Sequence, residues 1–133
     1  MKRYKRGITF GTYDLFHIGH LNILKRSKEL CEFLCVGVSS DALNYSKKQI
    51  YPVYNEEDRT QIVAAISVVD TVFLEESLEK KVQYIQEHQA DVLVMGSDWE
   101  GKFDFCKPYC DVIYLPRTEG ISTTQVKEDV KKV

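Results

Sequence analysis

The sequence predicts a doubly wound α/β fold, in which helices cover both faces of a five-stranded parallel sheet. Two features of the chain support this prediction. Short, continuous apolar runs recur along the sequence and alternate with longer segments in which apolar residues have helical spacing. The first of these runs also opens through a glycine turn into a helical segment, as the first strand of such a sheet does. We therefore expect a Rossmann-like arrangement.

The composition fits one globular domain over residues 1–133. Hydrophobic residues make up 44% of the chain and charged residues 29%, which is enough apolar material for one core. The formal net charge of −2 argues against the large basic face that nucleic acid requires. The sequence has no apolar run of the ~18 residues that a membrane helix needs and no signal-peptide pattern. We therefore expect a cytoplasmic protein with no membrane partner.

The first half of the chain supplies two strands and one helix. Residues 7–10 are expected to form the first strand, and residues 17–30 follow with leucines and isoleucines at helical spacing. A second apolar strand is expected over residues 33–39. The next stretch, residues 45–55, mixes lysines, tyrosines and a proline, which indicates a long loop.

The second half of the chain continues the alternation. Helices are expected over residues 59–69, 78–89 and 123–133, and strands over residues 71–74, 91–95 and 111–115. In a sheet of this kind, ligands bind outside the carboxyl ends of the strands. The turns that follow the strands should therefore line the binding site: residues 11–12, 39–40, 96–98 and 116–117.

The four cysteines form two pairs with three residues between the members of each pair: Cys31, Cys35, Cys106 and Cys110. Structural zinc sites typically use the tighter Cys-x-x-Cys spacing. Cys35 also lies inside an apolar run, where a thiol behaves as a small buried hydrophobe. We therefore expect reduced, structural thiols.

Residues 11–20, with the sequence GTYDLFHIGH, carry the strongest indication of function. A strand that opens into a helix directs backbone N–H groups and the positive helix end at one point, which favours an anion. His17 and His20 add imidazole donors in the first helical turn, where they are placed to stabilise a phosphoryl group in its transition state. Gly11 permits close backbone approach, and Gly19 leaves room beside the helix.

A second anion site is predicted over residues 117–125, with the sequence RTEGISTTQ. Ser122 and Gln125 have the spacing of a helix-capping box, which accounts for the hydroxyl groups without accounting for Arg117. An arginine beside hydroxyl groups at a helix N-terminus binds anions, and the two interpretations coexist because a capped helix still has N–H groups to offer.

Asp14 and the segment 96–105 each have both a structural and a functional interpretation. Asp14 either caps the turn that follows it or holds a divalent cation that arrives with a nucleoside triphosphate. The segment 96–105 either forms a packed apolar flap or covers a base or a polyol phosphate, with Asp98 as an acceptor and Trp99 as an aromatic wall.

Basic residues in the middle of the chain are ambiguous in the same way. Lys47 and Lys48 are either a solvated surface pair or part of a lid that closes on phosphates. Arg59, at the start of a predicted helix after an acidic run, has the same two interpretations.

Residues 11–20, 96–104 and 117–124 together resemble the motifs of the cytidylyltransferases, and in particular the small bacterial members that act on glycerol 3-phosphate. The resemblance extends over nearly the whole chain. It implies a Mg²⁺-dependent homodimer that joins CTP and glycerol 3-phosphate, by direct attack on the α-phosphate, to give CDP-glycerol and pyrophosphate. The product would then be a precursor of teichoic acid or capsule.

The residue chemistry and the resemblance together give an expected role for each candidate residue. Catalytic roles are expected of His17, His20, Lys47 and Arg117. Nucleotide binding is expected of Gly11, Thr12, Gly19, Asp98, Thr118, Ser122 and Thr123. Acceptor binding is expected of Asp14, Lys47, Trp99 and Arg59, and metal binding of Asp14.

One departure from the family pattern concerns the end of the helix before the third strand. The family commonly has an arginine in an Arg-x-Val-Asp-Glu stretch, whereas this chain has Ser67 at that position, followed by Val-Val-Asp-Thr. The likeness places that stretch near the dimer interface and the acceptor, so the departure concerns these two features more than the CTP chemistry.

Three alternatives remain open from the sequence. The enzyme could be a cytidylyl- or adenylyltransferase for another small phosphorylated alcohol. The His-x-Gly-His motif also occurs in class I aminoacyl-tRNA synthetases, although this chain has no basic stripe for tRNA. The third alternative is a nucleotide sensor without catalysis on the same fold.

Overall fold

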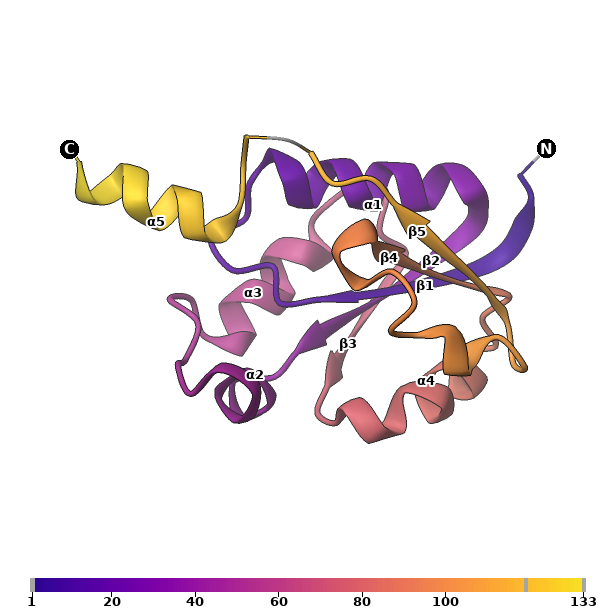
Figure 1. The fold of residues 1–133 in the computed structure, drawn as a ribbon. Coiled ribbons are helices and arrows are strands. Elements are labelled where there is room, and N and C mark those ends of the chain that lie inside the picture. The colour runs from indigo at the N-terminus through magenta and orange to yellow at the C-terminus, as the bar shows by residue number, and fades with distance from the viewer. Residues whose placement is uncertain (1, 119, 133) are drawn as a thin grey trace.

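The computed structural model describes residues 2–118 and 120–132 and contains a five-stranded parallel sheet (Figure 1). The strands lie in the order β3-β2-β1-β4-β5. Their bounds are β1 (Tyr4–Gly11), β2 (Cys31–Ser39), β3 (Thr71–Glu75), β4 (Val92–Gly96) and β5 (Asp111–Leu115). Each strand overlaps its predicted range, and the doubly wound α/β fold class is confirmed.

The described residues also contain five α-helices and three short 3-10 turns, of which all but the last helix lie between strands. The helices are α1 (Ile18–Leu30), α2 (Asp41–Lys48), α3 (Glu56–Ala64), α4 (Lys81–Glu87) and α5 (Thr123–Lys131). The 3-10 turns are η1 (Leu78–Lys80), η2 (Ser97–Trp99) and η3 (Asp104–Cys106). None of the described helices has the length and apolarity needed to cross a membrane.

The loop predicted over residues 45–55 is partly wrong, because its first residues belong to α2. Ser40 begins this helix as its N-cap and accepts a hydrogen bond from the Leu43 N–H at 3.0 Å. Only Leu43 and Asn44 are buried in α2, so the helix lacks the apolar periodicity that a sequence pattern can reveal. Lys47 and Lys48 therefore lie in the last turn of a helix.

Two other predicted helices differ from the structure at their boundaries. The helix expected over residues 59–69 begins earlier, at Glu56, because Asn55 caps it by accepting from the Asp58 N–H at 2.8 Å. The helix expected over residues 78–89 begins as the 3-10 turn η1 before it becomes α4. The C-terminal helix agrees with its prediction over α5, and the last predicted residue, Val133, lies outside the described residues.

The sheet separates two apolar cores. On one face, Leu24 of α1 and Val63 of α3 pack against β2 residues such as Val36. On the other face, Ile85 of α4 and Phe103 pack against residues of β1, β2 and β4. The inner strands β1, β2 and β4 are therefore covered on both sides, which explains their continuous apolar sequences.

All four cysteines belong to these cores. Cys31, Cys35, Cys106 and Cys110 are buried and free, and burial raises the pKa of each thiol, for Cys110 to about 11. A protonated thiol in such surroundings is inert. The buried, free cysteines agree with the prediction of reduced, structural thiols.

The order in which strands are added to the sheet reverses at β1. The chain adds β2 and β3 on one side of β1 and then β4 and β5 on the other, as Figure 1 shows. The carboxyl ends of strands on both sides of this point therefore border one region, which is where a doubly wound sheet binds its ligand. Helix α5 extends away from the sheet and has no buried residue.

Candidate functional site

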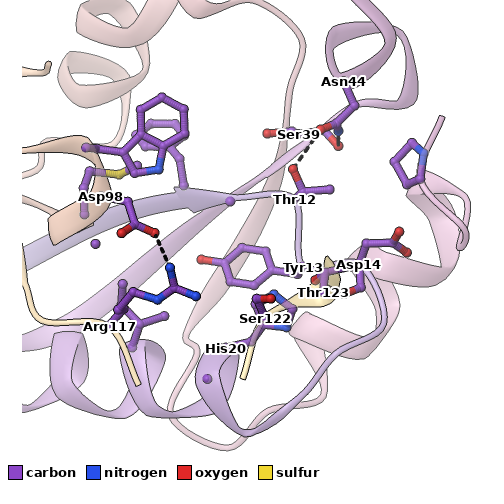
Figure 2. Close-up of a pocket in the computed structure, with 18 of the residues that line it drawn as sticks. Thr12, Tyr13, Asp14, His20, Ser39, Asn44, Asp98, Arg117, Ser122 and Thr123 are labelled. Carbon is purple, nitrogen blue, oxygen red and sulfur yellow. Dashed lines mark hydrogen bonds and ion pairs between the residues drawn. The ribbon is translucent and has the colours of Figure 1, made fainter. Parts of the chain in front are cut away.

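A pocket of about 530 Å³ opens at this carboxyl edge of the sheet (Figure 2). Every site residue predicted from the sequence lines the pocket, with the exception of Arg59. The predicted residues that line it are Gly11, Thr12, Asp14, His17, Gly19, His20, Lys47, Asp98, Trp99, Arg117, Thr118, Ser122 and Thr123. Segments from both ends of the sequence therefore meet around one cavity.

The turn between β1 and α1 has an unusual backbone conformation. Tyr13 and Leu15 have positive φ angles of 56° and 47°, which non-glycine residues seldom adopt. Gly11 precedes them, and a Cβ atom at this glycine would lie 2.8 Å from the Tyr13 ring. Such strain persists only where the surroundings fix it, and it is concentrated at functional sites.

Asp14 fixes this turn with its carboxylate. Its oxygens accept hydrogen bonds from the backbone N–H groups of Leu15 at 3.1 Å, Val53 at 2.7 Å and Tyr54 at 2.9 Å. The side chain thus joins the turn to the segment that precedes α3. Neither of the two interpretations offered from the sequence anticipated the contacts with Val53 and Tyr54.

His17 and His20 cap the first turn of α1 reciprocally. The Gly19 N–H donates to Nδ1 of His17 at 3.0 Å, and the His17 N–H donates to Nδ1 of His20 at 3.1 Å. The two rings stack with 3.8 Å between their centroids. Because Nδ1 is an acceptor in both rings, the neutral imidazoles carry their proton on Nε2 and can donate it to a ligand.

The surroundings keep both imidazoles neutral. Burial lowers the pKa of His17, and burial, together with the repulsion that a protonated His17 would cause, lowers the pKa of His20 to about 4. The capping arrangement also requires a small residue between them, because a Cβ atom at Gly19 would lie 2.8 Å from the His17 ring. Each histidine can therefore have both a structural and a functional role. Nδ1 caps the helix, and Nε2 is left for a ligand.

The segment after β5 brings a cation and a helix end to one side of the pocket. Arg117 forms an ion pair of 3.6 Å with Asp98, as Figure 2 shows, and both side chains are more than half exposed. Thr118 accepts a hydrogen bond from the Asn22 amide at 3.0 Å, which ties the segment to α1. Glu119 lies outside the described residues.

The N-terminus of α5 is anchored to the histidine turn. Ser122 is its N-cap and accepts from the Gln125 N–H at 3.0 Å. The second half of the predicted capping box is wrong, because the Gln125 amide donates to Asp129 at 2.8 Å instead. Thr123 donates to the Asp14 carbonyl oxygen at 2.9 Å, so the two sequence motifs are in direct contact.

On the other side of the pocket, Thr12 donates a hydrogen bond to the Asn44 side chain at 2.8 Å (Figure 2). This contact connects the first motif to α2, whose last turn carries Lys47. Lys47 lines the pocket, and burial lowers the pKa of its ammonium group. The lysine is therefore directed at the cavity from a helix.

Arg59 does not line the pocket and is fully buried beneath it. Its guanidinium donates to the carbonyl oxygens of Tyr54 at 3.0 Å, Thr12 at 2.8 Å and Ser39 at 2.8 Å, and to the Asp41 carboxylate at 2.7 Å. The arginine thus holds the ends of β1 and β2 in place. Arg59 is therefore the one predicted acceptor-binding residue that does not reach the cavity lining.

The rule that strand ends line the site correctly placed Ser39 there, and it would have found Glu75 had it also been applied to the third strand. Sequence reasoning missed Glu75, Lys81 and Asn44 among the polar residues of the pocket. Lys81 has no such indication, because it reaches the pocket from the start of α4.

The departure at Ser67 lies away from the pocket. Ser67 is exposed in the turn between α3 and β3 and is not among the lining residues. Ser67 therefore takes no part in the cavity walls of this chain.

The described residues contain no group of three histidine, cysteine, aspartate or glutamate side chains that could hold a metal ion. Asp14 is the carboxylate that the sequence suggested, but three backbone N–H groups already occupy its oxygens. The donor set therefore fits a positioning role for Asp14 better than direct metal coordination.

Comparisons with known proteins agree with this geometry. A sequence-family model described as Cytidylyltransferase-like matches residues 8–129. A glycerol-3-phosphate cytidylyltransferase from Bacillus subtilis is 51% identical over 127 residues, which cover 95% of this chain and 97% of that protein. A protein of the same name from Staphylococcus aureus is 46% identical over 127 residues, with 95% of each chain covered.

Solved structures share the fold at lower identity. A lipopolysaccharide core biosynthesis protein from Thermoplasma volcanium has a TM-score of 0.73 and 21% identity, with 86% of this chain and 98% of that one covered. The family match spans both the histidine motif and the Arg117 segment of this chain. The chain therefore belongs to the cytidylyltransferase-like family.

Proposed function

We propose that the protein transfers a cytidylyl group from CTP to glycerol 3-phosphate, giving CDP-glycerol and pyrophosphate. The observation that carries this proposal is one pocket whose lining brings together the Nε2–H donors of His17 and His20, a cation from α2 and a cation that follows β5. Relatives about half identical over nearly their whole length are named for this activity, which supports the choice of substrates.

The proposed reaction needs no covalent enzyme intermediate. An oxygen of the acceptor phosphate forms a bond to the α-phosphorus of CTP while the bond from that phosphorus to the bridging oxygen of the β-phosphate breaks. Pyrophosphate leaves with the bonding electron pair. The acceptor phosphate has a second pKa of about 6, so it is an anion near neutral pH and needs no general base.

The residues divide this work by position. The Nε2–H groups of His17 and His20 donate to the α-phosphate oxygens, where charge builds up in the transition state. Arg117 and the N-terminus of α5 bind the departing pyrophosphate. Lys47 attracts the acceptor phosphate from the side of α2. Asp98 and Trp99 border the nucleotide from the β4 side.

We also propose that the reaction requires Mg²⁺, which would be associated with CTP and would offset the charge of the triphosphate. Asp14 positions the turn beneath these phosphates through its backbone contacts. The proposal predicts loss of activity with a chelator and recovery with added Mg²⁺.

The resemblance further suggests a homodimer in the cytoplasm, and the edge strand β3 supports a dimer. Its residues Val72, Phe73 and Leu74 are only partly buried, as are Val68 and Val69 in the preceding turn. A second copy that covers this apolar edge would protect it from non-specific pairing. Light scattering on the purified protein tests this proposal directly.

The first experiment is to measure pyrophosphate release with Mg²⁺ and glycerol 3-phosphate, with CTP and ATP supplied separately. Release with CTP alone is the expected result. Release with ATP alone would contradict cytidine recognition. A panel of other phosphorylated alcohols would identify a different acceptor if glycerol 3-phosphate gave no release.

A further inference from the structure

Asn44 of α2 is a buried polar residue that lines the pocket and has no role in the proposed reaction. Its side chain is held by three hydrogen bonds, and the residue is 2% exposed. The amide oxygen accepts from the Thr12 hydroxyl at 2.8 Å (Figure 2). The amide nitrogen donates to the carbonyl oxygens of Ser39 at 3.3 Å and Ser40 at 2.9 Å. One side chain therefore joins the end of β2 and the start of α2 to the residue that follows β1.

These partners fix the direction of each hydrogen bond. Carbonyl oxygens only accept, so the amide nitrogen of Asn44 faces Ser39 and Ser40, and the amide oxygen faces Thr12. The Thr12 hydroxyl has one proton, which it donates to Asn44. An ionised phosphate oxygen also needs a donor. The Thr12 side chain in this conformation therefore serves the contact with α2 and does not donate to a phosphate.

Helix α2 has little else to hold its second half. Leu43 and Asn44 are its buried residues, and Asn44 is the last of them along the helix. The first turn has its own tether, because Asp41 pairs with the buried Arg59 at 2.7 Å. Lys47 follows in the last turn, beyond both of these anchors. The position of its ammonium group therefore depends on Asn44 more than on apolar packing.

Asn44 and Lys47 lie on the same face of α2, because residues three apart are neighbours on a helix. The Thr12 contact ties this face to the motif that carries His17 and His20. A misplacement of about 1 Å in a reacting complex can cost about a hundredfold in rate. Resting on the proposed function, we infer that Asn44 is a positioning residue. Through Thr12 it holds α2 against the histidine turn and so sets where Lys47 meets the acceptor phosphate.

A double-mutant cycle tests whether Asn44 acts through Lys47. Pyrophosphate release is measured with CTP and a range of glycerol 3-phosphate concentrations for Asn44→Ala, Lys47→Met and the double variant. Asn44→Ala should lower kcat/KM for glycerol 3-phosphate by about tenfold to a hundredfold, mainly through a higher KM. In the Lys47→Met background the same change should cost less than about threefold, because the group that it positions is absent.

A matched pair at Thr12 removes or keeps the same hydrogen bond from its other side. Thr12→Val keeps the shape of the side chain without the donor, and Thr12→Ser keeps the donor. Thr12→Val should reproduce the loss of Asn44→Ala, whereas Thr12→Ser should stay near the wild type. Ser46→Ala is the control on the same helix, because Ser46 is exposed, lies outside the pocket lining and donates to the Leu43 carbonyl oxygen. Its kcat/KM should be unchanged.

Two further results separate positioning from a general loss of structure. CTP binding measured by calorimetry should persist in Asn44→Ala and in Thr12→Val, which shows that the pocket is still assembled. A loss by the same factor with and without Lys47, or equal activities of Thr12→Val and Thr12→Ser, would overturn the inference while the proposed function stands. No turnover of glycerol 3-phosphate by the wild type would overturn both.

Discussion

The two histidines of the first motif each use one ring nitrogen for the fold and the other for the ligand. Nδ1 accepts a backbone N–H of the first turn of α1, and Nε2 remains as a donor toward the pocket. Substitutions that preserve one nitrogen at a time can therefore separate stability from catalysis.

His20→Asn and His20→Gln form a matched pair for this test. The asparagine amide oxygen replaces Nδ1, so His20→Asn should keep the cap but lower kcat by about a hundredfold to a thousandfold, as expected for a lost transition-state donor. The glutamine amide nitrogen reaches the place of Nε2, so His20→Gln should retain more activity while losing about 1 kcal/mol of stability. Urea unfolding and steady-state kinetics give the two readouts. The reverse order of activities would contradict the assignment of Nε2 as the donor.

The neutral state of His20 also predicts how stability depends on pH. Its pKa is lowered to about 4 in the folded protein, below the ordinary value of 6.5, so the unfolded chain binds more protons between these values. The contribution of His20 is therefore fully present above pH 6.5 and is lost as the pH falls toward 4. The free energy of unfolding should fall over this range in the wild type and less steeply in His20→Asn. Equal slopes in the two proteins would show that His20 does not titrate as described.

At the scale of elements, Arg59 of α3 connects the ends of the two central strands. It donates to the carbonyl oxygen of Thr12, which follows β1, and to that of Ser39, which ends β2. It also pairs with Asp41 at the start of α2. The site thus depends on a residue that has no contact with the cavity. Buried carbonyl oxygens at the ends of these elements need hydrogen-bond donors, and the Arg59 guanidinium supplies them.

Arg59→Lys should therefore affect stability more than substrate binding. A lysine cannot reproduce the planar fork that reaches several oxygens, so buried acceptors lose their partners. We expect the free energy of unfolding to fall by about 3 kcal/mol, because buried carbonyl oxygens are left without hydrogen-bond donors. The KM for glycerol 3-phosphate should stay within about twofold in the folded protein. A large rise in KM with unchanged stability would restore the acceptor role first considered for Arg59.

Elements with a clear apolar pattern could be predicted from the sequence. Elements and contacts that depend on polar groups could not. The five strands and the start of α1 follow from apolar runs and from the glycine turn. Helix α2 begins at a serine cap and buries only two residues, so periodicity could not reveal it. The contacts of Asp14 with Val53 and Tyr54 cross about forty positions of sequence and arise only when the chain is folded.

At the scale of the whole molecule, the pocket joins the two halves of the sheet. The β2–β3 half contributes Ser39 and Glu75, the β4–β5 half contributes Asp98 and Arg117, and the histidine turn lies between them. The site thus exists only when both halves are assembled around β1. A ligand that contacts both halves therefore binds the native state and has no equivalent site in the unfolded chain.

CTP should for this reason stabilise the protein against heat. A ligand at a hundredfold excess over its Kd adds about 2.7 kcal/mol to the free energy of unfolding when it binds the native state alone. For a domain of this size that increment raises Tm by roughly 10 °C. ATP at the same concentration should give a smaller shift, and Arg117→Ala should reduce the shift with CTP because it removes a cation from the triphosphate side. Differential scanning fluorimetry of the two proteins with each nucleotide measures these differences. Equal shifts with CTP and ATP would mean that the pocket holds the triphosphate without recognising cytosine, and the choice of nucleotide would then have to come from the reacting complex with the acceptor.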